Sequence, residues 1–129
     1  MDITEAQIKK GVDDYLTYAM NQGKLWFCRL NAGDFIELRG NSRRRIKGAP
    51  PGTADYIVIQ HGGFQMYHAI QRRVYTSHST AIVTFIECKS SEGKQSPAQC
   101  KFEKIIALFN CRYFIVRSVE DLQIALGME

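Results

Sequence analysis

The sequence predicts an α/β fold, a mixed central sheet flanked by helices, in a single domain formed by residues 1–129. Three observations predict it. Apolar residues recur at helical spacing near both ends, apolar runs of strand length lie between them, and clusters of Gly, Asn, Ser and Pro separate the runs. At 129 residues and 14.7 kDa, the chain is long enough for one hydrophobic core and too short for two.

The first expected element is a helix. Thr4 is a suitable N-cap, and the helix should end near residues 21–23. Glu5 falls within the apolar stripe, which is unusual for a carboxylate, although an acid in the first turn also complements the helix dipole. A structural and a catalytic role for Glu5 therefore both stay open. The residues that repeat on one face are Ile8, Val12, Tyr15, Leu16 and Ala19.

A short hairpin and a basic loop are expected next. Leu25–Leu30 and Phe35–Leu38 read as two paired strands joined by a turn at residues 31–34. The Gly, Asn, Ser and Pro content of the following segment predicts a loop. Both a solvated basic loop and a nucleic-acid contact fit it, and its position just before Asp55 favours phosphate binding. Five cations fall within nine residues of this segment: Arg39, Arg43, Arg44, Arg45 and Lys47.

Two buried strands are expected in the middle of the chain. Asp55–Gln60 opens on its acid and is broken by the His-Gly-Gly run at 61–63, whereas Thr80–Lys89 is the longest apolar run and should be central. The aromatic-rich segment 64–79 lies between them. We expect that segment to leave the core of the domain.

The C-terminal third should form a helix, a strand and a second helix. Ser96 is followed by Pro97 and Gln99, a pattern typical of a helix start, and the helix should end near residue 110. A strand at 111–117 follows, and Ser118 caps a closing helix that reaches Leu126. The stripe expected to be buried on the first of these helices comprises Phe102, Ile105, Ile106 and Phe109.

Composition excludes several classes of protein. The 45% hydrophobic and 23% charged content is that of a globular domain, and no apolar run is long enough for a membrane span. The N-terminal residues lack the pattern of a secretion signal. Four cysteines without Cys-x-x-Cys spacing disfavour a zinc site and favour a reduced, cytoplasmic protein in which Cys28, Cys88 and Cys111 pack as small hydrophobes. A net charge of +4 permits an anionic partner.

The residues with the clearest chemistry are Asp55, Glu87 and Lys89. Residues two apart on a strand share a face, so Glu87 and Lys89 should project together while Cys88 turns into the packing. Two neighbouring carboxylates repel each other unless a cation lies between them. With the backbone carbonyl of Cys88 they offer hard oxygen ligands for Mg²⁺, and Lys89 could neutralise charge on a phosphate. This set predicts phosphodiester hydrolysis.

Several motifs give the chain a resemblance to a known family. They are Glu5 in the first helix, residues 30–33, the run Gly-Thr-Ala-Asp-Tyr at 52–56, the run Phe-Ile-Glu-Cys-Lys-Ser-Ser at 85–91, residues 93–99 and residues 114–122. Together they resemble a stand-alone virus-type replication-repair nuclease (VRR-NUC) domain of the PD-(D/E)xK superfamily. Two departures are Ala54, where the family motif usually has proline, and the 32-residue step from Asp55 to Glu87, which leaves an insertion near residues 60–79.

The resemblance implies a restriction-endonuclease-like αβββαβ core, dependence on Mg²⁺ or Mn²⁺, and cleavage of branched DNA by a homodimer like those that resolve Holliday junctions. It places Asp55, Glu87 and Lys89 in the catalytic set, with Glu5 and Gln99 as auxiliaries. Gln99 also fits a capping-box role beside Ser96, and the two roles are compatible. The DNA-binding residues expected are Asn31, Arg43, Arg44, Arg45, Lys47, Lys94 and Lys101.

Two other functions stay open at this point. One is a nucleic-acid-binding module on the same scaffold that does not cleave. The other is an α/β interaction protein in which Asp55 and Glu87 lie too far apart to share an ion.

Overall fold

A computed structural model describes residues 3–128, except for the side chains of residues 64–68 and 75–79. The fold is α/β, as predicted. A four-stranded mixed sheet has the order β1-β4-β5-β6, in which only the β5–β6 pair is parallel. The strands of this sheet are β1 (Trp26–Arg29), β4 (Tyr56–His68), β5 (Arg73–Cys88) and β6 (Arg112–Val116).

Helices cover both faces of the sheet. They are α1 (Glu5–Asn21), α2 (Pro97–Ala107) and α3 (Val119–Leu126). Helices α1 and α3 contact each other, and their buried residues share one core cluster with Ile86 of β5. Phe85, the preceding residue, points to the opposite face and packs edge-on against Phe102 of α2 at 5.1 Å between ring centroids.

The first helix forms for the reasons seen in its sequence. Thr4 and Gln7 make a capping box, each side chain bonding to the backbone of the other residue. At the far end Gly23 takes a left-handed φ of +76°, which ends the helix. Four of the five predicted core residues are buried, and Tyr15 packs against the core while half-exposed.

The predicted hairpin of residues 25–38 is wrong. Strand β1 pairs with β4, while β2 (Asp34–Arg39) pairs with β3 (Ser42–Lys47) to form a separate two-stranded ribbon. The predicted basic loop is therefore a strand. The turn lies at Gly40 and Asn41, where Gly40 has a φ of +56°, and a Gly-first pair of this kind is typical of two-residue hairpin turns.

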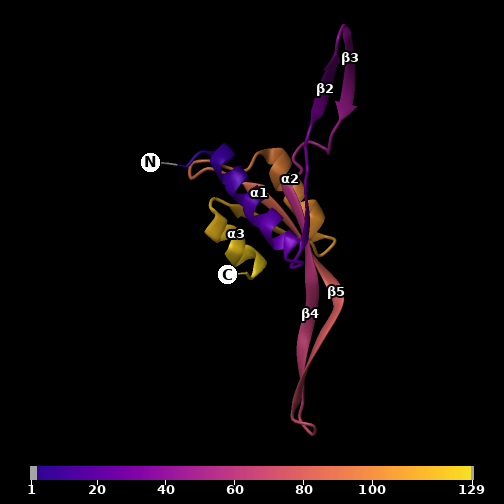
Figure 1. The fold of residues 1–129 in the computed structure, drawn as a ribbon, viewed down its shortest axis with the longest axis vertical. Helices are drawn as coiled ribbons and strands as arrows, with labels where there is room; N and C mark the ends of the chain where they lie inside the picture. Colours follow the sequence, from indigo (N-terminus) through magenta and orange to yellow (C-terminus); the bar gives the residue numbers. More distant parts are fainter. Residues whose placement is uncertain (1–2, 129) are drawn as a thin grey trace.

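Strands β4 and β5 extend well beyond the sheet. The predicted break at residues 61–63 is wrong, because β4 continues through this segment. Its pairing with β5 is only shifted by a bulge between Gly62 and Phe64. Strand β4 pairs with β1 only over its first residues and β5 with β6 only over its last, so their remaining lengths pair only with each other. The expected excursion from the core is this two-stranded arm. In Figure 1 the arm and the β2–β3 ribbon project from opposite ends of the body.

The C-terminal elements follow the prediction with two corrections. Ser96 and Gln99 form the expected capping box, and Ser118 caps α3, whose Leu122 and Leu126 are buried. Helix α2, however, ends at Ala107. The residues predicted as its buried stripe include Ile105 and Phe109, which are 46% and 72% exposed, because only the Phe102 side of the helix meets the sheet.

Cysteine packing was predicted in part. Cys88 is buried in the core, Cys111 is half-buried, and Cys28, on edge strand β1, is exposed. No helix in the described part of the chain is long and apolar enough to cross a membrane.

The loop before Asp55 packs closely against α2 through Gly52 and Ala98, and a substitution at Gly52 tests whether this contact fixes the loop. Gly52 has a φ of +90°, and a Cβ there would lie 2.5 Å from the Ala98 carbonyl oxygen, whereas Gly33 has a φ of +92° in open space. We expect Gly52→Ala to lower the free energy of unfolding by about 1–3 kcal/mol more than Gly33→Ala, because both suffer the backbone strain and only one suffers the clash. Urea denaturation measures the difference. Equal losses would show that this contact does not fix the loop.

Candidate active site

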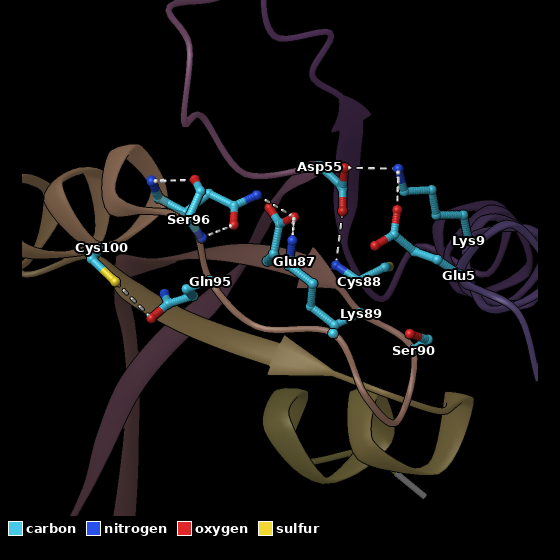
Figure 2. A network of polar contacts seen from close by, with 12 residues as sticks. Glu5, Lys9, Asp55, Glu87, Cys88, Lys89, Ser90, Gln95, Ser96 and Cys100 are labelled. Atoms are coloured by element: carbon cyan, nitrogen blue, oxygen red, sulfur yellow. Dashed lines mark hydrogen bonds and ion pairs between the residues drawn. The ribbon is translucent and has the colours of Figure 1, made fainter.

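The predicted catalytic residues converge at one end of the sheet. Asp55 directly precedes β4, Glu87 and Cys88 end β5, and Lys89 follows. The first turns of α1 and α2 reach the same place, and Figure 2 shows side chains from all four segments facing one another. Helix N-termini carry partial positive charge, so their convergence favours an anion at this position.

Asp55 is held by three partners. Its Oδ2 accepts a hydrogen bond from the backbone N–H of Cys88 (2.8 Å), and its Oδ1 pairs with Lys9 Nζ at 3.3 Å (Figure 2). Its backbone carbonyl accepts from the N–H of Leu30 (2.8 Å). The aspartate therefore joins the ends of β1, β4 and β5, and its carboxylate has one fixed direction.

Glu87 is a carboxylate buried to 4% exposure. Its Oε1 accepts a hydrogen bond from Gln99 Nε2 (2.9 Å) and lies 3.6 Å from Lys89 Nζ, whereas its Oε2 has no hydrogen-bond partner among the residues that the structure describes. Burial and then the negative charge of Asp55 raise the pKa of Glu87 to about 7, against the opposing effect of Lys89. A buried oxygen without a partner is costly, so its retention points to a ligand for it.

The alternation predicted for residues 87–89 is present. Cys88 is fully buried in the core, while Glu87 and Lys89 form an ion pair on the other face, where Lys89 keeps only 13% exposure. Burial, followed by the charge of Asp55, raises the pKa of the Cys88 thiol to about 12. The thiol therefore stays protonated, and its sulfur is neither a nucleophile nor a metal ligand here.

Gln99 completes the predicted capping box and also contacts Glu87. Its Oε1 accepts from the N–H of Ser96 (2.8 Å) in the capping box, and its Nε2 donates to Glu87. The helix cap thus orients the Gln99 side-chain amide toward the Glu87 carboxylate.

Lys9 is a site residue that the sequence analysis missed. It pairs with Glu5 and with Asp55, each at 3.3 Å, and its own carbonyl accepts from the hydroxyl of buried Tyr56 (3.2 Å). Burial lowers the pKa of Lys9, but the carboxylates of Asp55 and Glu5 outweigh it and raise the pKa above its usual value. The four-residue spacing from Glu5 was the available signal, since such residues are neighbours on a helix.

Two carboxylates and a backbone carbonyl fit a hard dication better than a soft one. Among the side chains that the structure describes, which exclude those of residues 64–68 and 75–79, no group of three or more His, Cys, Asp or Glu residues could hold a metal ion. Mg²⁺ tolerates such a site, because it keeps several waters and often binds through one or two carboxylates plus substrate phosphate. The unpartnered Oε2 of Glu87 supplies a free ligand atom. The residues present therefore fit Mg²⁺ or Mn²⁺.

The predicted DNA-binding residues are dispersed. Arg43, Arg44, Arg45 and Lys47 lie on β3, outside this cluster, and Arg45 Nε donates to Asp34 on β2 (3.1 Å). The others are nearer. Asn31 accepts the N–H of Ala49 at its backbone carbonyl, Lys94 lies in the loop after Lys89, and Lys101 lies on α2.

Comparison with known proteins finds no matching protein-family model, no matching curated protein and no matching solved structure.

The pKa of Glu87 predicts how stability varies with pH in EDTA. Because the folded-state pKa is raised, the protonated carboxyl stabilises the fold fully below about pH 4.5, and this contribution is lost as the pH rises to about 7. We expect the unfolding free energy of the wild type, relative to Glu87→Gln, to fall over that window by an amount on the order of 3 kcal/mol. Urea denaturation at several pH values measures it, and a constant difference would contradict the assignment.

Proposed function

We propose that this chain is a metal-dependent DNA endonuclease that hydrolyses phosphodiester bonds in branched DNA. The observation that supports it best is the buried Glu87 carboxylate, which has one unpartnered oxygen and lies beside Asp55 and Lys89. Burial, a specific charge partner and a strongly shifted pKa in one group together mark a candidate functional site.

The order of elements supports the kinship with VRR-NUC and other PD-(D/E)xK nucleases. If the β2–β3 ribbon is set aside, the chain runs α1, β1, β4, β5, α2, β6, and then α3. That is the αβββαβ order of the restriction-endonuclease-like core, with the acid of the first motif before the second strand and the Glu-x-Lys motif at the end of the third. The ribbon and the β4–β5 arm are then additions to that core.

In this proposal Asp55 and Glu87 hold Mg²⁺ or Mn²⁺ together with the Cys88 carbonyl. When bound, the dication supplies Lewis-acid chemistry, because it neutralises phosphate charge and eases deprotonation of water. Asp55 is already fixed by its bond to Cys88, so little reorganisation is needed. Gln99 keeps the Glu87 carboxylate in place.

The two lysines of the site have separate tasks. Lys89 lies on the Glu87 side and holds its ammonium where charge builds on the phosphorus. Lys9 lies on the Asp55 side, where Glu5 holds it by a second ion pair. Glu5 therefore acts on the site through Lys9.

Two features of assembly and location belong to the same proposal. A homodimer would place two cuts symmetrically across a four-way junction. Four free cysteines fit a reducing compartment such as the cytoplasm.

Incubation with branched, nicked and linear DNA tests the activity. We expect cleavage with Mg²⁺ or Mn²⁺ and none in EDTA, and we expect Glu87→Gln and Lys89→Met each to lower the rate on the order of 100-fold or more, because each removes a charge at the reacting phosphate. Glu120→Gln and Lys104→Met make the same chemical changes at exposed positions and should cleave normally.

Circular dichroism checks that each variant folds. Absence of cleavage on every substrate with either metal would overturn the nuclease, and DNA binding that persists under those conditions would identify a non-cleaving binding module.

A second variant tests the role of Lys9. Its ammonium lies 3.3 Å from Asp55 and repels an incoming dication. We expect Lys9→Met to bind Mn²⁺ several-fold more tightly while it cleaves more slowly, because the lysine opposes the metal but attracts phosphate. Calorimetric titration of Mn²⁺ and single-turnover cleavage measure the two effects. Weaker Mn²⁺ binding in this variant would show instead that Lys9 is needed to orient Asp55.

A further inference from the structure

The β2–β3 ribbon has two chemically different faces. Directly opposite residues of antiparallel strands share a face, and the register pairs Ile36 with Arg45 and Leu38 with Arg43. The next pair on that face is Asp34 with Lys47, and these two residues line a surface hollow together with Arg45. We call this side of the hairpin the basic ribbon face; it comprises Asp34, Ile36, Leu38, Arg43, Arg45 and Lys47.

On the basic ribbon face, the aliphatic side chains of β2 lie opposite the cationic side chains of β3. Ile36 and Leu38 are 67% and 70% exposed, and three cations stand opposite or beside them. The single carboxylate, Asp34, is paired with Arg45. The other face carries two cations, Arg39 and Arg44, of which Arg39 is paired with Glu37. Its apolar residues Phe35 and Ile46 lie opposite each other and are less exposed, at 44% and 40%.

Size and charge indicate what this face can bind. The B-DNA major groove, about 12 Å wide, admits a two-stranded β-ribbon and displays a distinct pattern for each base pair, whereas the minor groove is only about 6 Å wide. Cations along the ribbon would meet the phosphates on the groove walls, and the aliphatic pair would meet thymine methyl groups and base edges on its floor. A second copy of this chain fits less well, because a self-complementary interface would bring the same cations together.

We infer that the basic ribbon face inserts into the major groove of duplex DNA next to the point of cleavage. The inference rests on the proposed function for its ligand. It adds that one specific face of the ribbon reads the duplex, with Ile36 and Leu38 against the bases and with Arg43 and Lys47 on phosphates.

The base of the ribbon ties it to the active site. The N–H of Gly33 donates to the Ala49 carbonyl across the base, the N–H of Ala49 donates to the Asn31 carbonyl, and the loop after the ribbon leads through Gly52 to Asp55. Leu30, just before the ribbon, donates to the Asp55 carbonyl. Short segments therefore join the base of the ribbon to the strand end that carries Asp55, so a duplex on the ribbon would lie on the same side of the sheet as the carboxylates (Figure 1).

The experiment uses binding rather than cleavage, in the Glu87→Gln background with EDTA present. Fluorescence anisotropy on a labelled junction, repeated over a salt series, compares two double variants with matched controls. The first double variant, Arg43→Gln/Lys47→Gln, removes two ribbon charges. Its control, Lys24→Gln/Lys104→Gln, removes the same charge from exposed positions elsewhere. The second double variant, Ile36→Ser/Leu38→Ser, removes the two ribbon aliphatic side chains. Its control is Leu108→Ser/Ile124→Ser, in which the replaced residues are 80% and 79% exposed.

We expect the ribbon charge variant to reduce the slope of log K against log salt by roughly 2, since each phosphate contact contributes about 0.9. The ribbon aliphatic variant should weaken binding at least several-fold with the slope unchanged, and both controls should bind like the parent. Dimethyl sulfate footprinting identifies the groove, because it methylates guanine N7 in the major groove and adenine N3 in the minor groove. Guanine protection should be lost in the aliphatic variant.

Equal effects in ribbon and control variants, or protection of adenine alone, would overturn the inference. So would sedimentation in which the aliphatic variant changes the oligomeric state without changing DNA affinity, since the occupant would then be a second copy. A protein that binds DNA as expected but never cleaves it would contradict the proposed nuclease activity and support the ribbon contact. If all ribbon variants bind and cleave like the parent, the ribbon contact is contradicted and the nuclease activity is supported.

Discussion

The hydrogen bond from the backbone N–H of Cys88 to the carboxylate of Asp55 is the constraint on which the site depends. Regular pairing of β4 with β5 reaches its last pair at Tyr56 and Ile86, and the Asp55 side chain makes the next connection across the two strands. One oxygen is thereby satisfied by the backbone, which leaves the other to face Lys9. Lys9 pairs with this fixed carboxylate, and Glu5 pairs with Lys9 in turn.

Glu87 differs from Asp55 because one of its carboxylate oxygens is left without a hydrogen-bond partner among the described residues. It is buried, its Oε2 has no partner, and its pKa is raised, all of which reduce the stability of the fold at neutral pH. Natural sequences accept such local conflicts mainly where a function requires them. The helix cap at Ser96 and Gln99 partly compensates, because one amide completes the cap and bonds to the buried acid.

Sequence patterns predicted the parts of the fold that local chemistry determines. Caps at Thr4, Ser96 and Ser118 located the helices, and strand alternation placed Glu87 and Lys89 on one face. Strand pairing was not predictable in the same way. The partner of β1 lies about thirty residues along the chain, and the turn residues at 31–34 resembled those of a hairpin. Lys9 escaped notice because its role depends on Asp55, a contact between distant segments.

The balance of charge around the carboxylates has a consequence for how a polyanion approaches. Glu5, Asp55 and Glu87 carry three potential negative charges and Lys9 and Lys89 carry two positive ones, so the cluster is neutral whenever Glu87 holds its proton. A phosphate chain would then meet no net repulsion on entry. If, as proposed, a dication took the place of that proton, the pocket would become cationic and would attract such a chain more strongly.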